Sequence, residues 1–441
     1  MSPANASRSP ATARGALAGA AWLSAQPLLL NALSVPVTAI IIRSLGPESY
    51  GEWMIAVAIM SVAAVLGNLG LRGTFIRHVA QDPENAGPAF AEQLGLRLAL
   101  STIAAVVGVG ACWALGYGTT VIGCAALGGV ALVLTAIGST MADLLQAFGR
   151  MRTIAGAALL AGLALTLLSL IVAVLGGEAI EVAAAYVIGP ALTIALLAGA
   201  LRREGVPIAM RLSFDSSARL LRRCRHFASQ QALSVGSAHA ESLVLPRLVS
   251  AADFGLFAAG GMPAARLATV PDAIASAAFP TLASTCQHDR AAARSMVRRV
   301  AIAAVGVGVA LACGLTMIAV PLGTLLFPDG AGPFATVVAI SAWSLPILGA
   351  ELVLGTAVNA AGEDARFARV ALPSALLTIT ATVGLVLGFG VLGAACAMVA
   401  RPALRLAALA PLAHRTFAGS NRTRPAEALS SPREEVSRHA A

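Results

Sequence analysis

Residues 43–53 read RSLGPESYGEW, and residues 247–257 read RLVSAADFGLF. Both stretches interrupt long apolar runs, and four residue types recur in them at a constant separation of 204 positions. The paired positions are Arg43 and Arg247, Tyr50 and Phe254, Gly51 and Gly255, and Trp53 and Phe257. A repeat at the same point of two segments predicts a chain built from two similar halves that run in parallel.

The composition around these stretches excludes a soluble protein. Hydrophobic residues make up 58% of the 441 residues and charged residues only 12%, about half the usual charged share. Backbone groups in lipid must be bonded internally, so such long apolar runs predict helices of roughly 20 residues. About twelve spans are expected, at residues 15–42, 50–71, 91–116, 120–148, 153–176, 179–201, 226–249, 253–283, 292–326, 333–360, 366–389 and 390–414.

Arginines occupy every second gap between these spans and are nearly absent from the others. Because basic residues are retained on the cytoplasmic face, this alternation predicts that both termini are cytoplasmic. The net charge of +9 is then explained by loops facing anionic lipid rather than nucleic acid. The basic gaps contain Arg8 and Arg14, Arg72 and Arg77, Arg150 and Arg152, residues 202–225, residues 290–299, Arg366 and Arg369, and the tail from Arg415.

The sequence therefore predicts an all-α integral membrane protein with about twelve transmembrane helices in two parallel six-helix lobes. The expected segments are a disordered cytoplasmic N-terminus (1–14), an N-lobe (15–201), a basic cytoplasmic linker (202–225), a C-lobe (226–414) and a disordered cytoplasmic tail (415–441).

Arg43 and Arg247 break the alternation, since both fall at the predicted outer end of the first helix of a half. A guanidinium at a helix C-terminus satisfies orphan carbonyls and the negative end of the helix dipole. Capping is therefore the expected role of both arginines, and substrate contact is the alternative.

Three motifs carry a resemblance to a known family. They are the corner from Arg43 to Gly51, the stretch from Glu241 to Arg247 followed by residues 254–259, and residues 270–280, which begin Val-Pro and end Ala-Phe-Pro. Over roughly residues 15–414 the chain resembles the polysaccharide-transport branch of the multidrug/oligosaccharidyl-lipid/polysaccharide exporter superfamily, which contains the Wzx-type flippases.

The resemblance implies two lobes around a central cavity and transport by alternating access. The implied substrate is a polyprenyl-pyrophosphate-linked oligosaccharide, moved to the periplasmic leaflet of a bacterial inner membrane. Such a protein would work beside a polysaccharide polymerase and export machinery.

An anionic headgroup crossing hydrocarbon needs cationic or hydrogen-bonding groups, and ionisable residues at that depth are usually functional. Arg266, near the middle of the predicted span 253–283, is the first candidate, because its planar fork suits phosphate oxygens. An internal ion pair with Glu241 or Asp272 is the alternative. Arg401 lies similarly deep, although it could extend its side chain to the interface.

Carboxylates and amides complete the candidate residues. Glu241 and Glu351 are expected to be buried, and each could bind a coupling proton or neutralise an arginine. Asp143, near the cytoplasmic end of the predicted fourth span, could pair with Arg150 or Arg152. Amide side chains could line the cavity with sugar-binding groups or join helices: Gln26, Asn31, Gln230 and Asn359.

Enzymatic motifs are not found: there is no P-loop, no dinucleotide fingerprint and no metal-ligand spacing. The sequence thus predicts a transporter without cofactor or metal rather than an enzyme. The competing function is an ion-coupled small-molecule antiporter of the multidrug type. Many such antiporters resemble this topology but carry an acidic site in the first helix, where this chain offers Gln26 and Asn31.

Overall fold

A computed structural model describes residues 13–68, 71–204, 210–211, 235–327 and 330–418. Within these ranges all regular elements are helices. The first bundle consists of α1 (Ala13–Asn68), α2 (Leu71–Gln81), α3 (Ala86–Ala114), α4 (Thr119–Ala147), α5 (Met151–Val174) and α6 (Ala179–Arg203), with a 3₁₀ turn, η1 (Pro83–Asn85), before α3.

The second bundle begins with helical residues 235–244 and the 3₁₀ turn η2 (Leu245–Arg247). It continues with α8 (Ala251–Leu267), α9 (Thr269–His288), α10 (Arg290–Leu326), α11 (Ala331–Ala342), α12 (Ser344–Ala360) and α13 (Asp364–Ala418).

Two of the helices each contain a pair of predicted spans. α1 bends at Gly46, with φ of 71°, and α13 bends at Gly390, with φ of 57°. Positive φ is a conformation that glycine adopts without steric cost, so these glycines let the chain reverse within one or two residues. The predicted boundaries at 42–50 and 389–390 therefore fall at real turns.

Two other predicted spans are broken. The span predicted at 253–283 divides into α8 and α9 at Ala268, and the span at 333–360 divides into α11 and α12 at Trp343. The loop predicted after residue 71 also contains a short helix, α2. Neither the helix propensity of the residues nor the length of an apolar run reveals such a break, because each half is itself an apolar helix.

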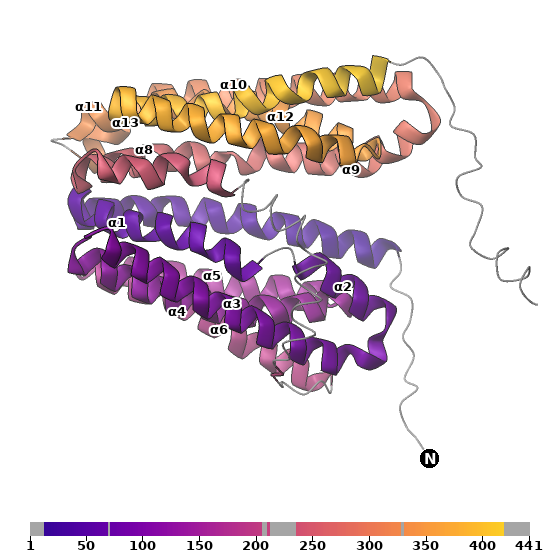
Figure 1. The fold of residues 1–441 in the computed structure, drawn as a ribbon, viewed down its shortest axis with the longest axis horizontal. Helices are drawn as coiled ribbons and strands as arrows, with labels where there is room; N and C mark the ends of the chain where they lie inside the picture. Colours follow the sequence, from indigo (N-terminus) through magenta and orange to yellow (C-terminus); the bar gives the residue numbers. More distant parts are fainter. Residues whose placement is uncertain (1–12, 69–70, 205–209, 212–234, 328–329, 419–441) are drawn as a thin grey trace, which may run out of the picture.

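The two bundles lie one above the other in Figure 1 and meet where α1 packs against α8. They are close together at the left, where α1 bends and α8 begins, and stand further apart at the right (Figure 1). We call the first the corner end and the second the arginine end. Within the first bundle, α1 also packs against α3, α4 and α5.

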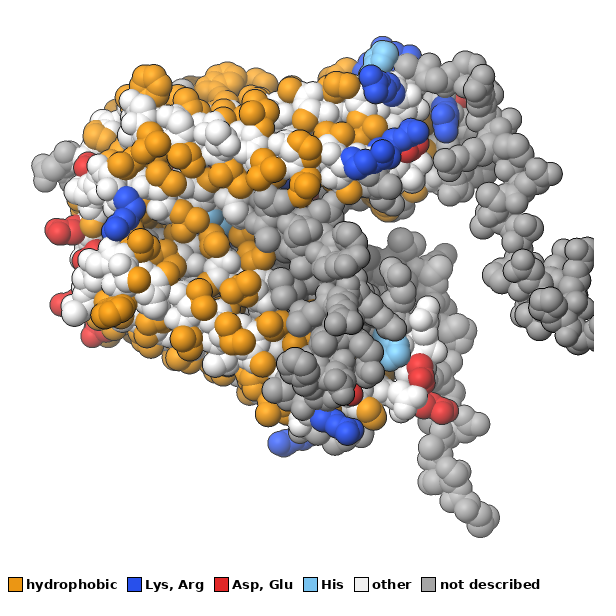
Figure 2. Space-filling model, in the orientation of Figure 1, with side chains coloured by type: hydrophobic (Ala, Val, Ile, Leu, Met, Phe, Trp, Pro, Cys, Tyr) orange, Lys and Arg blue, Asp and Glu red, His pale blue; other side chains and the backbone are white. Residues whose placement is uncertain are grey.

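The apolar side chains form a core within and between the bundles and also cover the outside. Tyr50, Trp53, Phe254, Phe257 and Phe334 belong to one buried cluster that spans the junction of α1 and α8. Figure 2 shows hydrophobic side chains along both bundles, with charged side chains gathered mainly at the ends. Eight helical stretches of the described residues are long and apolar enough to cross a membrane. The predicted all-α membrane fold is confirmed.

Candidate functional site

The break between α8 and α9 determines where Arg266 lies. Arg266 is in the last turn of α8, and the hydroxyl of Thr269, at the start of α9, donates to its carbonyl over 2.8 Å. Pro271 falls in the first turn of α9, where a missing N–H costs nothing. Broken helices at membrane depth are tolerated where they are buried or line a cavity, and transporters build their sites there.

Arg266 lines a cavity of about 370 Å³ together with residues of the first bundle. α1, α5 and α6 contribute the facing wall, which combines aliphatic side chains with hydroxyls. The described lining residues include no acid, so the guanidinium is their only charged group. The hydroxyl-bearing lining residues are Ser34, Thr38, Thr166, Ser169 and Tyr186.

Ser169 is the most suggestive of these hydroxyls. Its side chain is only 2% exposed, and its oxygen has no hydrogen-bond partner among the described residues. Thr166, one turn earlier, donates instead to the carbonyl of Gly162 over 2.7 Å. A buried hydroxyl without a partner costs free energy unless water or a ligand satisfies it. Ser169 is therefore suited to contact whatever occupies the cavity.

An aromatic cluster adjoins this cavity through Tyr186. Trp53 packs edge-on against Tyr50, with ring centroids 5.7 Å apart, and against Tyr186, 5.2 Å apart. Tyr186 and Leu165 also line a second, mostly apolar cavity of about 340 Å³ inside the first bundle. The positive charge of Arg266 acts on both Tyr50 and Tyr186, so the guanidinium lies within range of this aromatic group.

Two ion pairs connect helices inside the second bundle. Arg401 donates to the carboxylate of Glu241 over 2.9 Å and to the carbonyl of Ala238 over 2.7 Å. One turn later on α13, Arg405 Nε lies 3.3 Å from Glu351. Each carboxylate is buried and keeps a second oxygen without a hydrogen-bond partner among the described residues.

These pairs correct the expected pairing of Arg266. No ion pair between described residues joins Arg266 to Glu241, because Arg401 takes that carboxylate. Asp272 is exposed, and no ion pair between described residues joins it to Arg266. Neither of the two expected pairs is therefore present among the described residues.

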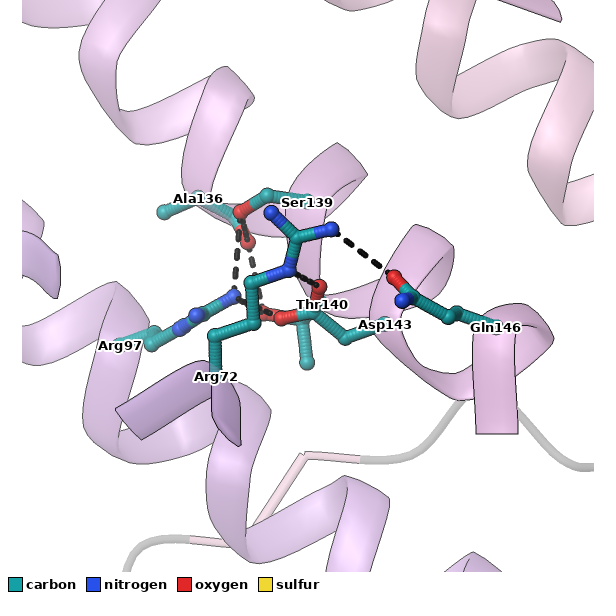
Figure 3. Close-up of polar contacts among 7 residues, drawn as sticks. All are labelled: Arg72, Arg97, Ala136, Ser139, Thr140, Asp143 and Gln146. Atoms are coloured by element: carbon teal, nitrogen blue, oxygen red, sulfur yellow. Dashed lines mark hydrogen bonds and ion pairs between the residues drawn. The ribbon is translucent and has the colours of Figure 1, made fainter. Parts of the chain in front are cut away.

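A third charged cluster lies inside the first bundle (Figure 3). Arg97 of α3 is 1% exposed, and its Nη1 lies 2.9 Å from an oxygen of Asp143 on α4. Arg72 of α2 lies 3.1 Å from the other oxygen and donates to Gln146 over 2.8 Å. The cluster therefore ties three helices together around one buried carboxylate. Arg97 also donates to the hydroxyls of Ser139 and Thr140.

This cluster overturns the expectation that Asp143 pairs with Arg150 or Arg152. Arg150 instead lies 2.7 Å from Glu204, just beyond the end of α6. Asp143 points into the bundle toward α2 and α3, whereas Arg150 follows the end of α4. Arg97 was not singled out from the sequence, although an arginine inside an apolar span with an acid nearby is a functional signal.

The remaining predicted residues fall in several places. Tyr50, Gly51, Phe254 and Gly255 are buried where α1 meets α8, whereas Arg43 and Arg247 are exposed. Asn359 is half-buried in the last turn of α12. The side chains of Gln26 and Asn31, and all of Gln230, lie outside the described residues. Across the described chain, no three His, Cys, Asp or Glu residues are grouped to hold a metal ion.

The fold is similar to solved transporter structures. An inward-facing multidrug resistance MATE family transporter of the MOP superfamily shares 15% identity, with 89% of this chain and 96% of that chain covered and a TM-score of 0.66. The lipid II flippase MurJ, in an inward closed conformation, shares 11% identity over 90% of this chain and 88% of that chain, with a TM-score of 0.65. A MOP superfamily transporter from Pyrococcus furiosus shares 14% identity over 91% and 95%, with a TM-score of 0.58.

No curated protein matches this sequence. The model of a family described as polysaccharide biosynthesis protein matches residues 40–330, more than half of the chain. The first two of these solved structures are described as a transporter and a flippase. The chain belongs to the polysaccharide biosynthesis protein family.

Proposed function

We propose that this transporter is a flippase that moves a polyprenyl-pyrophosphate-linked oligosaccharide across a bacterial inner membrane. The two bundles act as the lobes predicted at 15–201 and 226–414, and they alternate the side from which the cavity between them is reached. The corner end is periplasmic and the arginine end, with both termini, is cytoplasmic. At the arginine end the arginines contact anionic lipid. The protein works there beside a polysaccharide polymerase and export machinery.

The observation that carries this proposal is the position of Arg266. Its guanidinium lines a cavity between the bundles, at the end of a broken helix, opposite a wall of hydroxyls. A pyrophosphate carries the charge that a planar fork binds bidentately, and a sugar carries the hydroxyls that Ser169 and Thr38 can meet. The polyprenyl tail needs no protein site, because it stays in the bilayer while the headgroup crosses.

The multidrug-type antiporter is disfavoured by the charge of the same cavity. A cationic drug is repelled by a positive site, and here the one charged group among the described lining residues is Arg266. The carboxylates that could serve it are already paired with arginines of α13.

Depletion of the protein in cells separates these two functions. We expect lipid-linked oligosaccharide to accumulate on the cytoplasmic leaflet, measured by its protection from a glycan-modifying enzyme added outside spheroplasts. Drug sensitivity should not change. A changed drug sensitivity without such accumulation would replace the flippase by the antiporter.

We also propose that Glu241 takes part in ion coupling. A proton bound by Glu241 would neutralise the carboxylate that holds Arg401, leaving the guanidinium to interact with the anionic substrate. Glu351 and Arg405, one turn along α13, would repeat this exchange. His239, on the helix of Glu241, is the other titratable group beside this pair.

A charge-removal series tests the coupling. Glu241→Gln leaves Arg401 without its partner, and breaking such a pair costs about 3 kcal/mol of stability. Glu241→Gln combined with Arg401→Gln should recover the melting temperature in detergent. If the pair couples transport, export stays lost in the double variant; if export returns with stability, the pair is only structural.

A further inference from the structure

The backbones of the two bundles meet at two glycines. Gly51 of α1 and Gly255 of α8 are both buried. A Cβ added to Gly51 would overlap the carbonyl of Ala251, and one added to Gly255 would overlap the carbonyl of Pro47. Each added Cβ would also lie 3.0 Å from the backbone nitrogen of the other glycine. Backbone meets backbone here, so no flexible side chain can move aside.

This crossing has the symmetry of the sequence repeat. Gly255 follows Gly51 by 204 positions, and Ala251 follows Pro47 by the same 204 positions. Gly51 therefore faces Ala251, and Gly255 faces Pro47, which is the equivalent of Ala251 in the first half. A pseudo-two-fold axis passes between the two glycines, and a movement of one bundle against the other that keeps this symmetry opens or tightens both contacts together.

Arg247 adds a polar contact across the same junction. Its Nη1 donates to the carbonyl of Leu115 over 2.6 Å, and its guanidinium carbon lies 5.3 Å from the centre of the Tyr117 ring. Leu115 is the C-cap of α3, so the arginine of the second bundle caps a helix of the first. The expected capping role thus belongs to a helix of the other half.

Tyr117 is suited to this contact as a neutral ring. It lies in the turn between α3 and α4, outside the spans, and burial raises the pKa of its hydroxyl, although the charge of Arg247 opposes the shift. A neutral tyrosine face attracts a guanidinium through the ring quadrupole. All three tyrosines of the chain lie in the first bundle, and each lies near an arginine of the second.

Arg43 makes the junction asymmetric. It is the repeat equivalent of Arg247, but it is exposed and makes no hydrogen bond or ion pair with other described residues. One arginine contact, rather than two, must break when the bundles part at this end.

We propose that Gly51, Gly255 and Arg247 form the gate that closes the corner end of the transporter. The glycines let the backbones of α1 and α8 meet, and Arg247 holds them closed by binding the end of α3. This inference rests on the proposed alternation between two open sides, but it does not depend on which substrate is carried. When the corner end opens, the Arg247–Leu115 hydrogen bond breaks and the glycine contacts separate.

The test measures the distance across the gate. Spin labels at Thr119→Cys and Leu248→Cys, both exposed positions on opposite bundles, report the separation by double electron–electron resonance. The background replaces the six native cysteines by alanine and must retain export. We expect a short distance to dominate in the reference protein. Gly51→Ala, Gly255→Ala and Arg247→Ala should each move population to a longer distance, with about a tenfold rise in the open-to-closed ratio for Arg247→Ala.

Two matched variants make the test specific. Arg43→Ala removes the repeat-equivalent arginine, and Gly110→Ala adds a Cβ where nothing lies within 4 Å; neither should change the distance. Unchanged distances in Gly51→Ala and Arg247→Ala, or an equal shift in Arg43→Ala, would overturn the gate. The distance measurement contains no substrate. If the distances shift as expected but the glycan assay fails, the gate is kept and only the proposed substrate is rejected.

Discussion

Replacing Arg266 by alanine should reduce glycan export about a hundredfold while leaving insertion in the membrane unchanged. The estimate follows from losing a charge-assisted bidentate bond, about 3 kcal/mol, in a site of low dielectric. The measurement is complementation of export in cells that lack the native protein, with membrane levels followed by immunoblotting. Full export by Arg266→Ala would remove this residue from the transport site.

Arg266→Lys is the matched variant for that experiment. It keeps a positive charge but loses the planar fork, so we expect intermediate export if the ligand is a pyrophosphate. Ser169→Ala, on the facing wall, should reduce export less than Arg266→Ala, because a neutral hydroxyl contributes a weaker hydrogen bond. If the export levels of these variants did not follow the positive charge that each retains, an anionic ligand would be excluded.

Asp143→Ala is expected to be the most destabilising of the single substitutions considered. It leaves Arg97, 1% exposed, as an uncompensated charge inside the first bundle, at a cost of about 3–5 kcal/mol. Arg72 is 65% exposed and loses much less. The melting temperature in detergent measures the effect, and Asp143→Ala with Arg97→Leu should recover most of it.

Glu204→Ala provides the control for Asp143→Ala. It breaks the Arg150–Glu204 pair, whose side chains are 57% and 26% exposed, and such exposed pairs contribute only about 0–1 kcal/mol. If Asp143→Ala melted like Glu204→Ala, the cluster in Figure 3 would not stabilise the bundle.

The helices and their connections could be predicted from the sequence because a membrane allows few alternatives. An apolar run must be a helix, its length is set by the bilayer, and arginines mark the gaps. Gly46 marks the point at which α1 divides into two helices, and Gly390 marks the same point in α13. The repeat at Gly51 and Gly255 predicted two similar halves, but not that the two glycines meet where the bundles join.

The site could be predicted only in part, because pairing depends on how helices face each other. Glu241 and Arg401 are 160 positions apart, and nothing local in the sequence joins them. The break at Ala268 was hidden because Pro271 is tolerated in the first turn of a new helix as well as in a bent one. The hydroxyls of Ser169 and Thr38 gave no signal, since serine and threonine are common in membrane helices.

Translocation can be followed with the purified protein in proteoliposomes. A labelled polyprenyl-pyrophosphate oligosaccharide is placed in both leaflets, and a membrane-impermeant glycan-modifying enzyme is added outside. With the native protein we expect the inner-leaflet pool to become accessible, whereas with Arg266→Ala it should stay protected. If the inner-leaflet pool stayed protected with native protein that restores export in cells, under an imposed ion gradient of either sign, the protein would not be a flippase for this lipid.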